Sequence, residues 1–211
     1  MKPHFKLILT AFVFCAFSSL AHAQRSKSNE QTSKIGILQQ TYSGTKNHSF
    51  AEGSPAYGVE ISTDRGNNYL RYFLKGRISY STGLQNFLNL GTAFSSAYQF
   101  TTFAPELGIS IYPVSRRERG LNLYLWGVGV LSYNYLEINT LPTGSNIPPK
   151  DQGYGYGYGG GLGFEIMLSG ARVKSKSMIY GEVGFRDERA QLVKETAFEV
   201  GGITFSLGYG F

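Results

Sequence analysis

The segment from Gly153 to Leu168 has the most regular pattern of apolar and small residues in the chain. Apolar and aromatic residues occupy almost every second position from Tyr154 to Leu168, and glycine fills most of the positions between them. Successive side chains of a β-strand point to opposite faces, so this period of two predicts a strand. One face is aromatic and aliphatic and is expected to face lipid. The other is lined by glycine and is expected to face a narrow lumen.

The last segment of the chain repeats this pattern. Apolar residues at every second position alternate with small or polar residues, and the chain ends on an aromatic residue: Ile203, Phe205, Leu207, Tyr209 and Phe211. We therefore predict a final β-strand with one apolar face.

Turn residues and alternation together predict eight strands. The expected segments are Ser33–Tyr42, a second strand with Tyr57, Val59 and Ile61 on its lipid face, Asn68–Tyr80, a fourth strand around Leu107–Ile111 that ends at Tyr112, Leu121–Ile138, Gly153–Leu168, Met178–Arg186 and Phe198–Phe211. The parity of the first strand stays open. In the fifth, either Leu121, Leu123 and Leu125 or Tyr124, Trp126, Val128 and Val130 face lipid, and a bulge could exchange them.

The connections between these strands alternate in length. The short ones are Asp64–Asn67, Ser115–Gly120 and Ser169–Ser175, and the long ones are Ser43–Ala56, Ser81–Phe100, Asn139–Gln152 and Asp187–Thr196. Transmembrane barrels have short periplasmic turns and longer external loops, and an even number of strands returns both termini to the periplasmic side.

The N-terminus has the three parts of a secretory signal peptide. Lys2 and Lys6 precede an apolar run from Leu7 to Leu20, which ends at the small-residue site Ala21-His22-Ala23. We expect residues 1–23 to be removed and residues 24–211 to form one domain, with the only cysteine, Cys15, lost with the signal peptide.

Composition and charge narrow the class of protein. The chain has 27 Gly, 15 Tyr and 15 Phe, which favours an all-β fold. The expected mature chain carries 18 basic against 14 acidic residues, without the clustered basic stripe that nucleic-acid binding needs. It also has no run of 18 apolar residues, so a helical membrane protein is excluded.

The final strand, with its terminal Phe211, resembles the signal by which outer-membrane barrels are read by the barrel assembly machinery. The whole mature chain is similar in pattern to the small OmpA- and OmpX-type outer-membrane barrels. This resemblance implies an all-β, eight-stranded antiparallel transmembrane up-and-down barrel in the bacterial outer membrane, in contact with lipid and lipopolysaccharide. It carries no residue-specific motif beyond the C-terminal strand, so no functional residues are transferred from it.

The strand parities place charges of both signs in the lumen. The expected lumen residues are Glu60, Arg71, Lys75, Arg77, Glu106, Glu165, Glu182 and Arg186. An eight-stranded barrel is just wide enough for side chains to fill it, so these groups should form ion networks rather than line a channel. Pairing across the Asp64–Asn67 turn should bring Glu60 close to Arg71.

The sequence gives little support to catalysis. The expected mature chain has one histidine, His48, which lies beside Ser49 and Glu52 in the first long loop. Neighbours on one loop lack the rigid support that a catalytic triad needs, and too few ligands are present for a metal site. We predict no enzyme activity and no cofactor.

Two non-enzymatic functions remain. The protein could be a structural, envelope-stabilising barrel whose loops contact lipopolysaccharide. Alternatively, it could bind an extracellular partner through the 81–100 segment, which carries Leu84, Phe87, Leu88 and Leu90. A small pore or a soluble ligand-carrying barrel is a weaker alternative. The soluble barrel would put apolar residues inside and glycine outside, opposite to the pattern of Gly153–Leu168.

Overall fold

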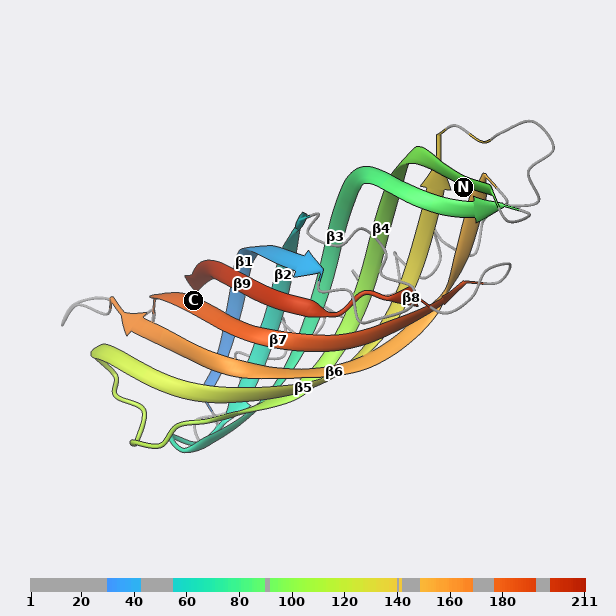
Figure 1. Ribbon diagram of the computed structural model, residues 1–211. Coiled ribbons are helices and arrows are strands. Elements are labelled where there is room, and N and C mark those ends of the chain that lie inside the picture. The colour runs from blue at the N-terminus through green and yellow to red at the C-terminus, as the bar shows by residue number, and fades with distance from the viewer. Residues whose placement is uncertain are drawn as a thin grey trace.

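A computed structural model describes residues 30–42, 55–89, 92–139, 141, 149–168, 177–192 and 198–211. These residues form β-strands joined by turns (Figure 1). The strands are β1 Glu30–Tyr42, β2 Pro55–Gly66, β3 Leu70–Asn89, β4 Thr92–Ile111, β5 Gly120–Ile138, β6 Lys150–Met167, β7 Met178–Leu192, β8 Phe198–Glu199 and β9 Gly202–Gly210. No helix in the described part of the chain is long and apolar enough to cross a membrane.

The strands form one closed antiparallel barrel. Each of β1 to β6 pairs with the strand before or after it in the sequence, β9 joins β1 to β7, and β6 pairs with β7 to close the ring. β8 is a two-residue segment that pairs with β7 ahead of β9, and Val200 and Gly201 interrupt the ladder between them. β8 and β9 therefore act as one interrupted strand, and the barrel has the eight strands that were predicted.

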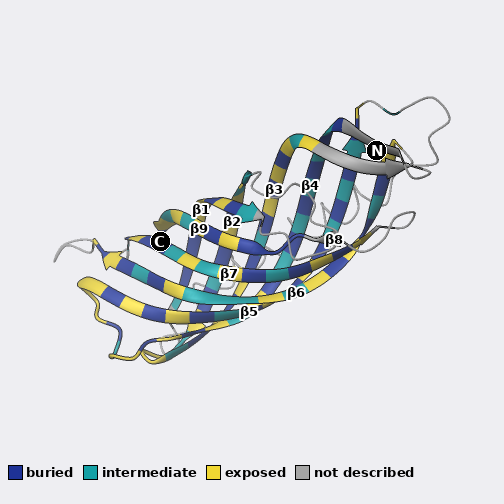
Figure 2. Cartoon of the chain, in the orientation of Figure 1, coloured by how far each residue is buried: buried dark blue, intermediate teal, exposed yellow. Residues whose placement is uncertain are grey.

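The structure confirms that apolar residues face outward on alternate positions of the strands. It also shows which residues face outward on β1 and β5, the two strands for which the sequence left this open. In β5, Leu121, Leu123 and Leu125 point outward, while Tyr124 and Trp126 are buried inside the barrel. This alternation of buried and exposed positions continues along β5 without a bulge (Figure 2). In β1, Ile35 and Ile37 are the outward residues.

Large side chains of β5 extend into the lumen and lie over glycines of β6 and β7. A Cβ atom at Gly163 of β6 would lie 2.2 Å from the Tyr124 ring, and one at Gly184 of β7 would lie 2.3 Å from the Trp126 ring. Real side chains do not approach so closely. The glycine-lined face of β6 is therefore needed for the rings of β5 to fit inside the barrel.

The turn between β2 and β3 lies further along the chain than predicted. β2 continues through Asp64 to Gly66, and the reversal occurs at Asn67–Tyr69, where the Asn67 Oδ1 accepts bonds of 2.8 Å from the backbone N–H groups of Tyr69 and Leu70. An Asp, Arg, Gly, Asn run is typical of a turn, which led to the wrong placement. The displaced turn changes the register of this hairpin.

Several predicted loops are strand instead. Residues 81–89 and 92–100, predicted as one long loop, form the outer parts of β3 and β4, which pair from Leu70 opposite Ile111 to Asn89 opposite Thr92. β6 begins at Lys150 and β7 continues to Leu192, so both also extend into predicted loops. These extensions need no continuous apolar face, so alternation could not reveal them. The remaining predicted connections 43–54, 142–148 and 169–176 lie outside the described residues, as do 193–197.

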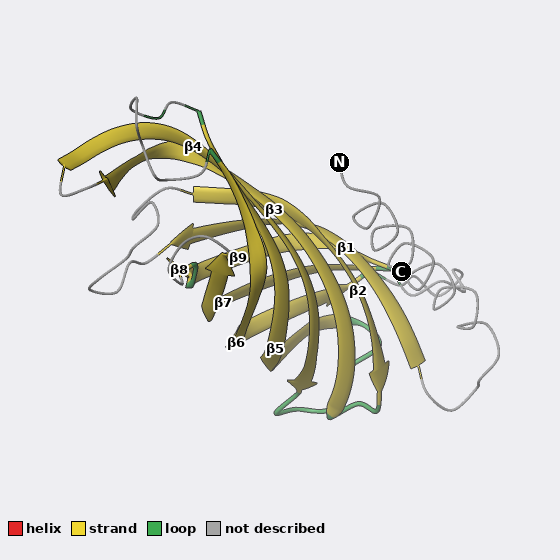
Figure 3. Ribbon diagram, turned by 90° about the vertical axis from the view of Figure 1, so that its right-hand side faces the viewer, coloured by secondary structure: helices red, strands yellow, loops and turns green. Residues whose placement is uncertain are grey.

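The β3–β4 hairpin projects beyond both neighbouring strands. β2 pairs with β3 no further than Ala56 opposite Ser81, and β5 pairs with β4 no further than Ile138 opposite Tyr98. The hairpin lies at the end opposite the β2–β3 and β4–β5 turns, the start of β1 and the end of β9 (Figure 3). We call its end the outer end of the barrel and the other the turn end.

Candidate functional site: the ion-paired lumen and the outer wall

The barrel has an apolar exterior and a charged interior. Exposed fractions reach 66% for Ile37, 68% for Leu107 and 59% for Leu162, all on the outer wall. Buried charged residues alternate with these exposed apolar ones along the strands, and Figure 2 shows the alternation of buried and exposed positions. Their ion pairs involve six cationic and six anionic residues: Lys34, Arg71, Lys75, Arg77, Arg116 and Arg186 with Glu60, Asp64, Glu106, Glu165, Glu182 and Glu188.

The group nearest the turn end is built around Glu165. Its Oε1 accepts bonds from Lys34 Nζ at 2.8 Å and from the Tyr112 hydroxyl at 2.9 Å, and its Oε2 accepts from Arg116 Nε at 2.7 Å. Lys34 also lies 3.1 Å from Asp64. Arg116 belongs to the connection between β4 and β5, so this connection sends a side chain back into the lumen and forms its floor.

The middle group is centred on Lys75. Its Nζ lies 2.7 Å from Glu182 Oε2 and 3.3 Å from both carboxylate oxygens of Glu60. Glu60 also accepts a bond of 3.0 Å from the Tyr180 hydroxyl, and Glu182 accepts one of 2.9 Å from the Tyr124 hydroxyl. Each carboxylate is thus held by a cation and by a tyrosine, from strands on different sides of the lumen.

The group nearest the outer end is centred on Arg77. Its Nε donates to Glu106 at 2.9 Å, its Nη1 donates to Gln40 at 2.7 Å, and its Nη2 pairs with Glu188. Glu106 also pairs with Arg186, whose guanidinium lies 5.5 Å from the centre of the Trp126 ring. Gln40 in turn donates to the Val200 carbonyl at 2.6 Å, which ties the interrupted last strand to this group.

An apolar cluster lies beyond these charges at the outer end of the lumen. Its buried members come from four strands and from the interruption of the last strand: Ala56, Tyr98, Phe100, Leu136, Ile138, Ala190 and Val200. Charged groups and apolar side chains therefore occupy successive levels of the lumen. This arrangement is a packed interior rather than a pore lined by unpaired charges.

All eight lumen residues named from the sequence point into the barrel. Arg71, Glu106 and Glu165 are almost completely buried, and the other five side chains also take part in the ion pairs. Sequence reasoning missed four more members: Lys34, Asp64, Arg116 and Glu188. Lys34 lies on the strand whose parity was open, and the other three were assigned to turns or loops.

The predicted pairing of Glu60 with Arg71 is wrong. The carboxylate partner of Arg71 is Asp64, at 2.6 Å, and the cationic partner of Glu60 is Lys75. The cause is the displaced turn: Glu60 lies opposite Arg77, and Arg71 lies opposite Gly66. Glu60 and Gly66 are six residues apart on β2, which is about 20 Å along a strand.

The C-terminal residues named as an assembly signal lie on the outer wall. Phe205, Leu207, Tyr209 and Phe211 are between 44% and 56% exposed. Phe211 also forms two backbone hydrogen bonds with Ser33, at 2.8 and 2.9 Å, which join the last residue of the chain to β1. Recognition by the assembly machinery remains a prediction.

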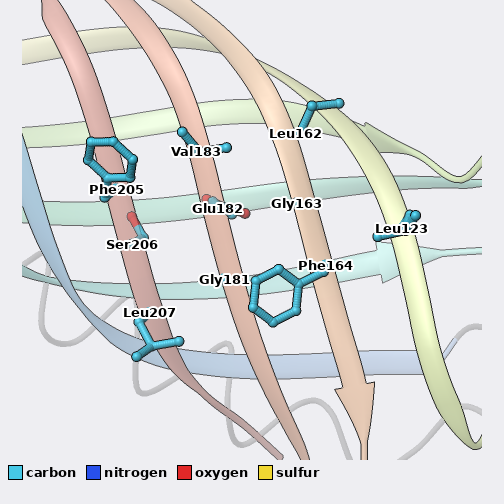
Figure 4. Close-up of a pocket in the computed structure, with 10 residues that line it drawn as sticks. All are labelled: Leu123, Leu162, Gly163, Phe164, Gly181, Glu182, Val183, Phe205, Ser206 and Leu207. Carbon is cyan, nitrogen blue, oxygen red and sulfur yellow. The ribbon is translucent and has the colours of Figure 1, made fainter.

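A shallow depression of about 300 Å³ lies on the outer wall across β5, β6, β7 and β9 (Figure 4). Leucine, valine and phenylalanine side chains line most of it, and the Phe164 ring covers the space where Gly181 has no side chain. The lining also includes Glu182 and Ser206, whose polar groups bond to Lys75, Tyr124 and Glu60 of the lumen.

The residues that the structure describes contain no group of three His, Cys, Asp or Glu residues that could hold a metal ion. His48, Ser49 and Glu52 lie outside the described residues, as does the predicted signal peptide.

Comparison with known proteins finds similarity among solved structures. No protein-family model matches the chain, and no curated protein matches it. Among solved structures, the chain is similar to Ail, the attachment invasion locus protein of Yersinia pestis, whose crystal structure was determined in complex with the heparin analogue sucrose octasulfate. The two are 14% identical, the match covers 86% of this chain and 99% of that one, and the TM-score is 0.49.

Proposed function

We propose that this protein is a non-enzymatic integral barrel of the bacterial outer membrane that stabilises the envelope, with an outer rim that contacts surface ligands. The observation that carries the proposal is the reversed distribution of polarity. A water-soluble barrel would expose its charges and bury its leucines. Here Leu107 and Leu162 are exposed on the outside, while Glu106 and Glu165 are buried in the lumen.

The cost of exposing this wall to water supports a membrane location. Leaving one large aliphatic side chain exposed rather than buried costs about 1.5–3 kcal/mol, and outward apolar residues occur on β1 to β7 and on β9. A hydrocarbon environment removes this cost, and a closed barrel leaves no unpaired strand edges within it. The charged lumen also argues against a carrier of apolar ligands, which needs an apolar interior.

The direction of insertion follows from the connections. Both ends of the barrel sequence lie at the turn end, which we assign to the periplasm, and the β3–β4 hairpin lies at the outer end, which we assign to the cell surface. We infer that the barrel assembly machinery recognises the last strand, since its outward apolar residues and terminal Phe211 fit a recognition signal.

Fractionation of cells tests this proposal. The protein should be recovered with outer membranes, and its folded form should migrate differently from the boiled form on a detergent gel. Surface protease should cut at the outer end and spare the turn end. Recovery in the soluble periplasm would contradict the proposal.

Partner binding at the cell surface is a second candidate function. The specific observation in its favour is that residues 83–89 and 92–96 of the β3–β4 hairpin extend past both neighbouring strands. Replacing residues 83–97 with a short turn should leave the folded barrel in the membrane and abolish binding to host-cell or bacterial surfaces. Unchanged binding by the shortened protein would remove the hairpin from consideration.

A further inference from the structure

Three tyrosines form a column on the outer wall of β6. Tyr154, Tyr156 and Tyr158 occupy successive outward positions and are 71%, 62% and 66% exposed. Tyr133 of β5 adds a fourth ring, because it lies opposite Tyr154 in the ladder and meets it edge to face at 5.4 Å between ring centres. We call these four residues the tyrosine face.

The tyrosine face extends above the level expected for the hydrocarbon core. At a rise of about 3.4 Å per residue and a tilt of about 40°, Tyr158 lies about 26 Å above Leu168, the lowest outward leucine of this wall. The apolar band of such barrels is about 25 Å tall. Tyr158 therefore lies at the edge of the band, and Tyr154 lies about 10 Å above it.

β7, which pairs with β6 on one side, gives the same boundary. Asp187 and Arg189 of β7 point outward and lie opposite Tyr158 and Tyr156 in the ladder, and Phe185 is the last apolar outward residue before them. Charged side chains do not settle on the lipid face within the hydrocarbon. An ordinary ring of interfacial aromatic residues explains Tyr158, but it does not explain large exposed rings at two further levels.

Polar groups that can bind hydroxyls surround these rings. Asp187 lies opposite Tyr158 in the ladder, and the Tyr133 hydroxyl donates to Gln152 Oε1 at 2.7 Å. Flat rings beside carboxylate and amide groups suit a sugar. The C–H face of a pyranose can lie on tyrosine, while its hydroxyls bond to polar side chains at the edge.

We propose that the tyrosine face binds the glycan of a glycolipid in the outer leaflet. This inference rests on the proposed outer-membrane location, which puts Tyr154 and Tyr156 in the layer of sugar headgroups. The lipid anchor of the same molecule would lie on the leucines below. The site is thus a lateral one on the barrel wall, separate from the outer rim and the β3–β4 hairpin.

Saturation-transfer NMR on the refolded mature protein in micelles tests the site. The probe is core oligosaccharide released from lipopolysaccharide by mild acid, with a second sample freed of its phosphates. The protein should transfer saturation to sugar protons in both samples. Tyr154→Thr combined with Tyr156→Thr should weaken binding about tenfold, since two ring contacts are lost.

Matched variants separate sugar binding from general effects. Tyr69→Thr combined with Tyr72→Thr removes two exposed rings near the turn end and should leave binding unchanged. Tyr154→Phe combined with Tyr156→Phe keeps the rings and should retain most of the binding, which covers the case in which the threonine variant does not fold.

Three results would overturn the inference: equal transfer in the threonine variant and its control, transfer that disappears with the phosphates, or loss of binding in the phenylalanine variant. Localisation is measured separately. Oligosaccharide binding by a protein found outside the outer membrane would contradict the proposed function, whereas an outer-membrane protein without saturation transfer contradicts this inference alone.

Discussion

Removing the Arg71 guanidinium should destabilise the barrel through Asp64 and not through Glu60. Arg71 is fully buried, its Nε and Nη2 lie 2.7 and 2.6 Å from Asp64 Oδ1, and Glu60 is held by Lys75. Arg71→Met therefore removes one of the two cations beside Asp64, and Lys34 remains at 3.1 Å. Breaking a buried pair from one side costs about 3–5 kcal/mol, and we expect the lower end because Lys34 stays.

A double-mutant cycle identifies the partner. Asp64→Asn alone removes the carboxylate that lies 2.6 Å from Arg71 and should cost about as much as Arg71→Met. The two together should cost about 1–3 kcal/mol less than the sum, because no stranded charge remains. Combining Arg71→Met with Glu60→Gln should instead be additive to within about 0.5 kcal/mol, because those residues are far apart on the hairpin.

Equilibrium unfolding by urea in micelles measures these free energies. The chain has a single tryptophan, Trp126, which is 5% exposed inside the lumen, so its fluorescence should report loss of the packed interior. Coupling of Arg71 to Glu60 that equals or exceeds its coupling to Asp64 would show that the register of the β2–β3 hairpin is wrong.

Three further predictions concern the pore, the closing strand and the packed wall. In planar bilayers the purified protein should give no large, steady conductance, and a stable porin-like step would contradict the filled lumen. Phe211→Ala should lower the yield of assembled barrel more than Val114→Ala, at an exposed position in a turn, and equal yields in outer membranes would remove the special role of Phe211. Gly161→Val should prevent folding or cost several kcal/mol in urea titrations, because its Cβ would lie 2.1 Å from a backbone oxygen, whereas Gly127→Ala has open space and should fold normally.

The sequence predicted the part of the fold that repeats a two-faced pattern. Alternation in β5, β6 and β9 is imposed by an apolar outside and a crowded inside, so these strands could be predicted from it. The outward face of β5 was ambiguous in the sequence, and only the packing in the structure settled it. The outer half of the β3–β4 hairpin could not be found this way. Its residues include Ser81, Thr82 and Gly83, which carry no apolar stripe for a core or a lipid phase to select.

The lumen residues were predicted where alternation showed clearly which face of a strand points inward. They were missed where the sequence indicated a turn. Asp64 and Arg116 lie in segments that were predicted as turns, yet both side chains are buried in the ion-paired lumen. Their roles depend on contacts with Lys34 and Glu165, which lie far away in the sequence. Such long-range pairing is set by the shear of the closed barrel and has no local signature.

The shared carboxylates of the lumen constrain how this sequence can diverge. Glu165 forms ion pairs with both Lys34 and Arg116, and Glu106 forms them with both Arg77 and Arg186. Loss of the charge on either glutamate therefore leaves two cations without this partner. An outward leucine can be exchanged for another apolar residue with no such consequence. Among relatives of this protein, outer positions should therefore drift one at a time, while lumen positions should change in correlated sets whose charges still cancel.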